Sequence, residues 1–146
     1  IEFYLILAAI TAVASSLFWR LMTASIVMLV AGYLGEVAGA GSAALWPCFA
    51  VGMAGWLYIV YEIFAGEASK ISAENGTPAS QKAFNALRLI VTVGWVIYPL
   101  GYVYGYAGGG DADTLNLIYN LADFVNKIAF CLAIWQAAKN ETLDKA

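Results

Sequence analysis

The stretch that decides the fold lies near the C-terminus and reads, from Asn116 to Trp135, NLIYNLADFVNKIAFCLAIW. It has the length of roughly 20 residues that an α-helix needs to cross the hydrocarbon core of a bilayer. Lys127 nevertheless lies near its middle, where an ammonium group costs at least about 2.5–3.5 kcal/mol. Asp123 precedes this lysine by four residues, so both side chains share one helix face and can pair. Charges inside a membrane span usually mark a functional site.

The composition around this stretch is that of a membrane protein. Of the 146 residues, 62% are hydrophobic and 12% are charged, whereas soluble domains have about 45–50% apolar and about 25% charged residues. A soluble domain of this size could not bury that much apolar surface, so the surplus is expected to face a lipid bilayer. We therefore predict an all-α membrane protein with a single domain over residues 1–146.

Several functional classes are excluded by the residues that are missing. The net charge is −3 and no basic stripe is present, so nucleic acid is not expected as a partner. The chain has no histidine, which excludes His-based zinc sites and catalytic triads. Cys48 and Cys131 lie in separate apolar runs without a second cysteine at metal spacing, and buried thiols of this kind act as small hydrophobic groups. No metal site is predicted.

Five apolar stretches can be recognised, over residues 1–14, 21–37, 44–65, 83–106 and 114–138. The last three are long enough to span a bilayer, and the second can span if neighbouring small residues extend it. The first would reach only about 21 Å, so we expect its helix to begin upstream of Ile1. Residues 66–78 are expected to form a solvated loop, and Gly108–Gly110 a turn before a last helix capped by Asp113.

The cations predict the orientation of the chain. If every stretch crosses the membrane, one side carries Arg20, Lys70, Lys82, Lys139 and Lys145, with Arg88 just inside that end, and the other side carries no cation. By the positive-inside rule the first side is cytoplasmic. The C-terminus is then cytoplasmic, and the loop containing Asp111 and Asp113 faces outward.

The buried lysine has a specific chemistry. Removal from water favours the neutral amine, which attacks carbonyl groups to form a Schiff base. Once protonated, that imine needs a counter-ion, and Asp123 is suitably placed. The simpler interpretation is a structural ion pair that faces the interior of a helix bundle.

A chromophore aldehyde would also need a long aromatic slot. Trp95, Tyr98 and Tyr102 recur at spacings of three and four and so share a helix face, and Pro99 is expected to free a carbonyl and bend that helix. A second candidate wall consists of Phe49, Gly52 and Trp56, where Gly52 would leave room, and Met28 could add a soft wall. Either aromatic row by itself is more often packing or interface belt. Glu36 and Glu62 are expected to reach the membrane interface, with a role between subunits as the alternative for Glu36.

Three stretches resemble the proteorhodopsins. Residues 116–128 are similar to the seventh helix of that family, residues 94–99 (GWVIYP) to its sixth helix, and residues 2–6 (EFYLI) to the middle of its third helix. The resemblance implies a seven-helix rhodopsin bundle, of which this chain supplies the second half of helix 3 and helices 4 to 7. It also implies a bacterial inner (cell) membrane protein that assembles as a homo-oligomer, a pentamer or hexamer.

The resemblance assigns roles to individual residues. Lys127 would carry all-trans retinal as a protonated Schiff base, and Asp123 would belong to the counter-ion complex. Trp95, Tyr98 and Pro99 would line the retinal, with Tyr119 and Asn120 close to the lysine. Glu2 matches the cytoplasmic proton donor, and an apolar setting would keep its carboxyl protonated in the dark.

Three functions are compatible with this sequence. The leading interpretation is a light-driven outward proton pump, hence an ion transporter and not an enzyme, because a glutamate at the donor position favours proton export. The first alternative is a sensory photoreceptor with the same chromophore. The second is a transporter or scaffold in which Asp123 and Lys127 are only a buried pair.

Overall fold

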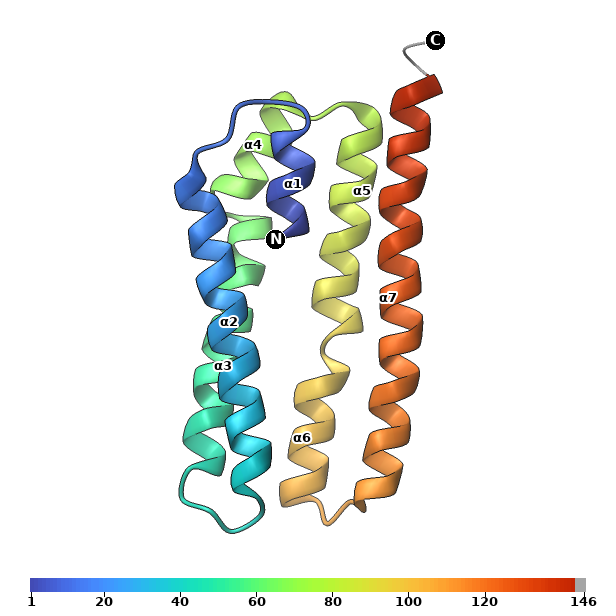
Figure 1. The fold of residues 1–146 in the computed structure, drawn as a ribbon. Coiled ribbons are helices and arrows are strands. Elements are labelled where there is room, and N and C mark those ends of the chain that lie inside the picture. Colours follow the sequence, from blue (N-terminus) through green and yellow to red (C-terminus); the bar gives the residue numbers. More distant parts are fainter. Residues whose placement is uncertain (144–146) are drawn as a thin grey trace. The chain divides into compact units, whose positions relative to one another are not determined.

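The computed structural model of the chain describes residues 1–143, except for the side chain of Ala112, and contains helices but no strand in that range (Figure 1). The chain divides into two compact units, residues 1–75 and residues 76 onward. The first unit contains α1 (Glu2–Ala8), α2 (Ser15–Ala38), α3 (Leu45–Phe64) and α4 (Glu67–Asn75). The second contains α5 (Pro78–Leu89), the π-helical segment η1 (Ile90–Gly94), α6 (Ile97–Ala107) and α7 (Ala112–Leu143). The predicted all-helical class is confirmed for the described residues.

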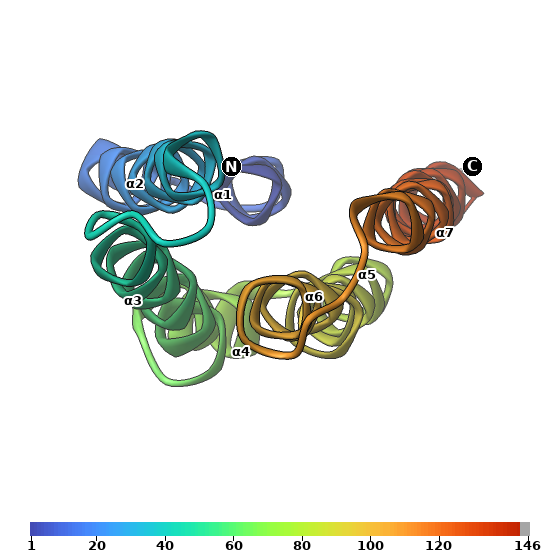
Figure 2. The ribbon, with the colours of Figure 1, turned by 90° about the horizontal axis from the view of Figure 1, so that it is seen from below.

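The first unit is built on the pair α2 and α3, which lie side by side (Figures 1 and 2). Their connection turns at Gly39 and Gly41, whose φ angles of 75° and 82° are in the region that favours glycine. A Cβ added at Gly55 would lie 2.8 Å from the backbone oxygen of Ala24. Small residues therefore let the two backbones approach closely, as is common between membrane helices.

Two predicted boundaries in this unit were wrong. The second apolar stretch was predicted over residues 21–37, but α2 spans Ser15–Ala38 and is 24 residues long. The predicted loop over residues 66–78 contains the nine-residue helix α4, and only Gly76 and Thr77 connect it to α5. Ala68 and Ser72, one helical turn apart, are buried. Hydropathy misses such a helix because small residues form its packed face.

The second unit contains a long interrupted helix and α7. Thr77 caps α5 by accepting a hydrogen bond of 3.1 Å from the backbone N–H of Ser80, and Pro78 follows the cap. The turn at Gly108–Gly110 was predicted correctly, and Gly109 has a φ of 72°. Asp111, and not Asp113, caps α7, because its carboxylate accepts the backbone N–H of Thr114 at 2.8 Å. A carboxylate three residues before its donor has the N-cap geometry.

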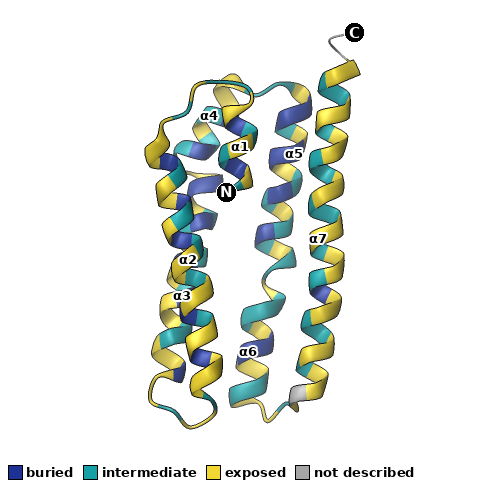
Figure 3. Cartoon of the chain, in the orientation of Figure 1, coloured by how far each residue is buried: buried dark blue, intermediate teal, exposed yellow. Residues whose placement is uncertain are grey.

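Four helical stretches of the described residues are long and apolar enough to cross a membrane: Ser15–Ala38, Leu45–Asn75, Pro78–Ala107 and Asp113–Leu143. Large apolar side chains are exposed along them, and α7 in particular shows mostly exposed and intermediate residues (Figure 3). Such surfaces suit a lipid environment. Lys145, one of the cations used to predict the orientation, lies outside the described residues.

Candidate functional site

The centre of the candidate site is the pair of charged side chains on α7. The Lys127 ammonium donates a hydrogen bond to Asp123 Oδ2, four residues earlier on the helix. The Lys127 side chain is 75% exposed and that of Asp123 42%. Lys127 lies midway along a candidate membrane span, and no other side chain of the described residues pairs with its amine. An amine with one carboxylate partner and open surroundings is accessible to a carbonyl compound.

Tyr98 supports the acid from the neighbouring helix, and Tyr119 on α7 contacts Tyr98 in turn. The Tyr98 hydroxyl on α6 donates a hydrogen bond of 2.5 Å to Asp123 Oδ1, so each carboxylate oxygen has its own donor. The Tyr119 hydroxyl donates to the backbone oxygen of Tyr98 at 3.2 Å, and the two rings are 5.7 Å apart. The second unit thus brings together four predicted site residues: Tyr98, Tyr119, Asp123 and Lys127.

The predicted interruption of the sixth helix is confirmed and has a traceable cause. Proline has no N–H, so Pro99 cannot donate to the carbonyl of Trp95 four residues earlier. The Trp95 oxygen accepts the N–H of Tyr98 at 3.1 Å instead. The carbonyl of Gly94 consequently lacks its usual partner within the helix. The interruption falls at Trp95 and Val96, directly after the π-helical segment.

Asn126 fills the gap that this interruption leaves, and sequence reasoning assigned it no role. Its side-chain amide donates a hydrogen bond of 3.0 Å to the freed Gly94 oxygen. A Cβ at Gly94 would collide with the same amide, so the glycine and the asparagine fit one another. The only available signal was that Asn126 precedes Lys127 in the motif.

The other predicted residues of the second unit lie on these helices. Trp95 is half-buried in the interruption, and Pro99 is half-buried in the first turn of α6. Tyr102 is buried, with its ring 4.7 Å from that of Tyr106. Asn120 is exposed on α7.

The remaining predicted residues belong to the first unit. Glu2 lies in the first turn of α1, with its side chain 51% exposed. Met28 on α2 and Phe49 and Trp56 on α3 are half-buried. Gly52 does not leave room for a ligand: it is buried, and a Cβ there would lie 3.3 Å from the Met28 backbone oxygen. Its missing side chain is used by the contact between α2 and α3.

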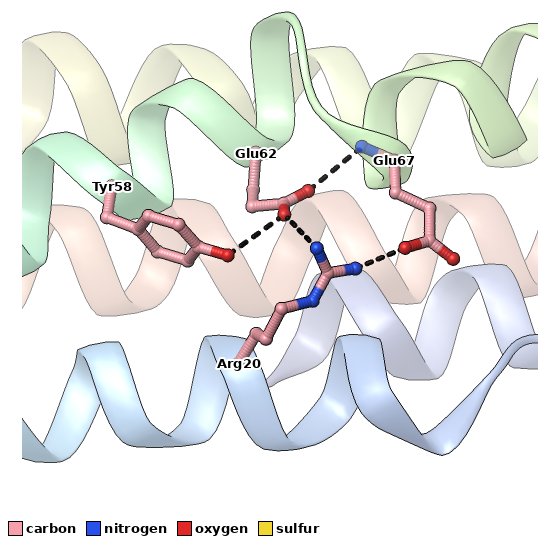
Figure 4. Close-up of polar contacts among 4 residues, drawn as sticks. All are labelled: Arg20, Tyr58, Glu62 and Glu67. Carbon is pink, nitrogen blue, oxygen red and sulfur yellow. Dashed lines mark hydrogen bonds and ion pairs between the residues drawn. The ribbon is translucent and has the colours of Figure 1, made fainter.

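The expectation that Glu62 reaches the membrane interface was wrong. Its side chain is 2% exposed and is the centre of a group of four residues, Arg20, Tyr58, Glu62 and Glu67, which we call the Glu62 cluster (Figure 4). Glu62 Oε1 lies 3.0 Å from Arg20 Nη1 and accepts the Tyr58 hydroxyl at 3.1 Å. Glu62 Oε2 accepts the backbone N–H of Glu67 at 3.0 Å, and Arg20 also pairs with the Glu67 carboxylate. A buried carboxylate is stable only with such partners.

The chain is similar to known proteins both in sequence and in structure. The chain is 54% identical to the blue-light absorbing proteorhodopsin of Gamma-proteobacterium Hot 75m4 and to the green-light absorbing proteorhodopsin of Gamma-proteobacterium EBAC31A08. Each match covers 97% of this chain and 56% of the relative's length. The crystal structure of blue light-absorbing proteorhodopsin from Med12 superimposes with a TM-score of 0.74 at 48% identity, covering 96% of this chain and 60% of that one.

A family model reaches the same result. The model described as bacteriorhodopsin-like protein matches residues 1–141, which include both described units and the Lys127 motif. The all-helical architecture and the candidate membrane spans are consistent with part of a seven-helix bundle. This chain therefore belongs to the bacteriorhodopsin-like family.

Proposed function

We propose that this chain supplies the retinal-binding half of a light-driven outward proton pump. The observation that carries the proposal is the Lys127 amine at mid-span, paired with Asp123, which is in turn held by Tyr98. The relatives named as proteorhodopsins support the retinal chromophore. When bound, all-trans retinal supplies a light-driven isomerisation.

The residues of this chain would hold the chromophore and handle its proton. Lys127 Nζ would bind the retinal aldehyde with loss of water, and Asp123 would balance the positive charge that remains on the nitrogen. Tyr98 restrains the Asp123 carboxylate, because a hydrogen bond to an ionised group is strong and directional. Glu2 would return a proton to the nitrogen after light has driven one outward. Trp95, Pro99 and Tyr102 would line the polyene.

The surroundings of the pump are part of the same proposal. We infer a multi-pass protein of the bacterial inner membrane, with the C-terminus in the cytoplasm, since the cations fall on one predicted side. The homo-oligomer implied by the resemblance is proposed with it. The exposed apolar surfaces of the four candidate spans support the membrane location.

Replacing Lys127 tests the proposal directly. Because the chain spans 56% of the length of its proteorhodopsin relatives, it is expressed in bacterial membranes behind the N-terminal part of the green-light absorbing relative, with all-trans retinal. Lys127→Ala is expected to lack the visible absorption band and light-induced acidification of the medium. Lys139→Ala removes another lysine of α7, which stacks on Trp135, and is expected to keep both. A visible band in Lys127→Ala would refute the assignment.

A further inference from the structure

The Glu62 cluster has no role in the proposed function, although its buried carboxylate is bonded to three partners. It connects three helices: Arg20 comes from α2, Tyr58 and Glu62 from α3, and Glu67 from α4 (Figure 4). A buried ion pair of this kind is weak support for stability, since apolar replacements often serve as well. Its geometry suggests a specific task at the junction between α3 and α4.

Glu62 closes the gap between these two helices. α3 ends at Phe64 and α4 begins at Glu67. The first backbone N–H groups of a helix lack partners within the helix, and Glu62 Oε2 accepts the N–H of Glu67 at 3.0 Å. A Cβ at Gly66 would collide with the Glu62 carboxyl group and would lie 2.7 Å from the Glu62 Cα, so this glycine lets the junction pack closely against both. One side chain thus caps α4 and holds it to the end of α3.

Arg20 fastens this junction to α2. One guanidinium nitrogen lies 3.0 Å from Glu62 Oε1, and the other pairs with the Glu67 carboxylate. A planar guanidinium can bridge two carboxylates through separate N–H groups, whereas a lysine offers one compact charge. The position of α4 is therefore fixed from two neighbouring helices.

The helix that carries Glu2 depends on α4. This helix is α1 (Glu2–Ala8). It packs against α2 and α4. Phe3 and Leu7, one turn apart, are buried, and the Tyr4 ring lies 5.3 Å from that of Phe18. A displacement of α4 would remove part of the surface that holds α1 in place.

We propose that the Glu62 cluster is a latch that fixes α4 on α2 and α3 and thereby positions α1 and its Glu2. Arg20 and Glu62 are then positioning residues for the return of the proton, and neither exchanges a proton with the chromophore. This inference rests on the proposed function only where it concerns Glu2. The latch itself is a property of the first unit.

The latch is tested first without any light reaction. Cys48 and Cys131 are replaced by alanine, and spin labels are attached at Ser16 on α2 and Glu74 on α4, two exposed positions of the first unit. Arg20→Gln and Gly66→Ala are expected to broaden the distance distribution between the labels, the second by displacing the Glu62 carboxylate and the adjacent end of α3 without removing a charge. Ser25→Ala breaks a hydrogen bond inside α2 and should leave the distribution unchanged. An unchanged distribution in both latch variants would overturn the inference.

The consequence for Glu2 is tested by flash spectroscopy of the retinal-loaded protein described above. Arg20→Gln and Gly66→Ala are expected to slow the decay of the deprotonated state about tenfold, less than the 10²–10⁴ that a positioned acid or base typically contributes. Azide, a small weak acid that carries protons from solution, is expected to restore the rate, as in Glu2→Gln. Arg20→Lys should be intermediate, and Ser25→Ala should decay like the parent.

The two readouts separate the possible failures. Broadened label distances with an unchanged decay would leave the mechanical latch but refute its action on Glu2. If Lys127→Ala kept its visible absorption band, the proposed function would be refuted. The distances between the spin labels would still test the latch. Slow decay that azide does not correct would contradict a positioning role, because it would point to general damage of the protein.

Discussion

At the scale of single residues, burial decides which charges matter. Glu62 has a side chain that is 2% exposed and bonds to three neighbours, while Arg20, its cation, is 41% exposed. Lys127 and Asp123 pair along one helix and remain open to their surroundings. A buried acid needs fixed partners, whereas a lysine amine reacts with a carbonyl group when removal from water favours its neutral form. The first pair therefore suits a structural role, and the second suits the binding of a chromophore.

Because Glu62 is buried and Arg20 is partly exposed, substitutions of these two residues should lower the free energy of unfolding by different amounts. Arg20→Gln leaves the buried Glu62 carboxylate without a cation and is expected to destabilise the protein by about 3 kcal/mol. Glu62→Gln leaves an arginine that water can solvate, so we expect a loss of about 1 kcal/mol. Unfolding by a denaturing detergent measures both, with Ser25→Ala as the control. An equal or reversed order would contradict the assignment of Glu62 as the buried partner.

At the scale of secondary structure elements, glycine and capping residues set how the helices meet and where they begin. Gly52 and Gly55 let α3 approach the backbone of α2, and Pro99 with Gly94 produces the interruption that Asn126 bridges from α7. Asp111 caps α7 and Thr77 caps α5. The hydrogen bond between Asn126 and Gly94 joins α7 to the same interrupted helix from which Tyr98 reaches Asp123.

The contact between α2 and α3 gives a matched pair of glycine substitutions. A Cβ in Gly55→Ala would lie 2.8 Å from the Ala24 backbone oxygen and 3.1 Å from the Met28 nitrogen, so the helices must separate. Overpacking of this kind costs about 1–3 kcal/mol. Gly32→Ala, on α2, meets nothing within 4 Å and should be neutral or slightly stabilising. Thermal unfolding compares the two variants. Similar melting temperatures for Gly55→Ala and Gly32→Ala would contradict the close approach of α2 and α3.

The cap of α7 predicts a dependence on pH. The backbone N–H of Thr114 is the main group that holds the pKa of Asp111 below its usual range. A lowered pKa means that the cap stabilises the helix above the pKa of the unfolded chain and is lost as pH falls through that of the folded chain. Hydrogen exchange at the Thr114 amide, corrected for intrinsic rates, should lose protection at acid pH.

Two substitutions at the cap separate charge from hydrogen bonding. Asp111→Ala should raise the exchange rate of the Thr114 amide several-fold at neutral pH, since alanine cannot accept its hydrogen bond. Asp111→Asn retains an acceptor and should protect the amide at every pH. A parent protein whose protection does not change with pH would show that the carboxylate is not the cap.

At the scale of the whole molecule, the distribution of apolar surface and charge governs the relation to the membrane. Large side chains such as Leu29 and Leu117 are 65% and 69% exposed, which water would penalise and lipid tolerates. The candidate spans follow one another along the chain with short connections. If each candidate span crosses the membrane, successive connections lie on alternate sides of it.

This alternation predicts which residues an external reagent can reach. After Cys48 and Cys131 are replaced by alanine, Ala43→Cys and Asp113→Cys should react with a membrane-impermeant maleimide in intact spheroplasts. Asn75→Cys and Lys139→Cys should react only after the cells are opened. Labelling of all four sites in intact spheroplasts, or the reverse pattern, would overturn the proposed orientation.

Much of the architecture followed from the order of residues. Hydropathy located the spans because lipid selects long apolar helices, and the spacing of Asp123 and Lys127 predicted their pair because four residues make about one helical turn. Local turn chemistry identified the Gly108–Gly110 connection. It misplaced the cap of α7 and missed α4, where a polar composition concealed a packed face of small residues.

The tertiary structure decided what depends on partners distant in the chain. Arg20 meets Glu67 across 47 positions, and Asn126 meets Gly94 across 32. No periodicity encodes such pairs, because the helix contacts that produce them are made by side chains from separate segments. Gly52 shows the same limit: the sequence provides a residue without a side chain, but only packing decides whether a ligand or the α2 backbone takes the space.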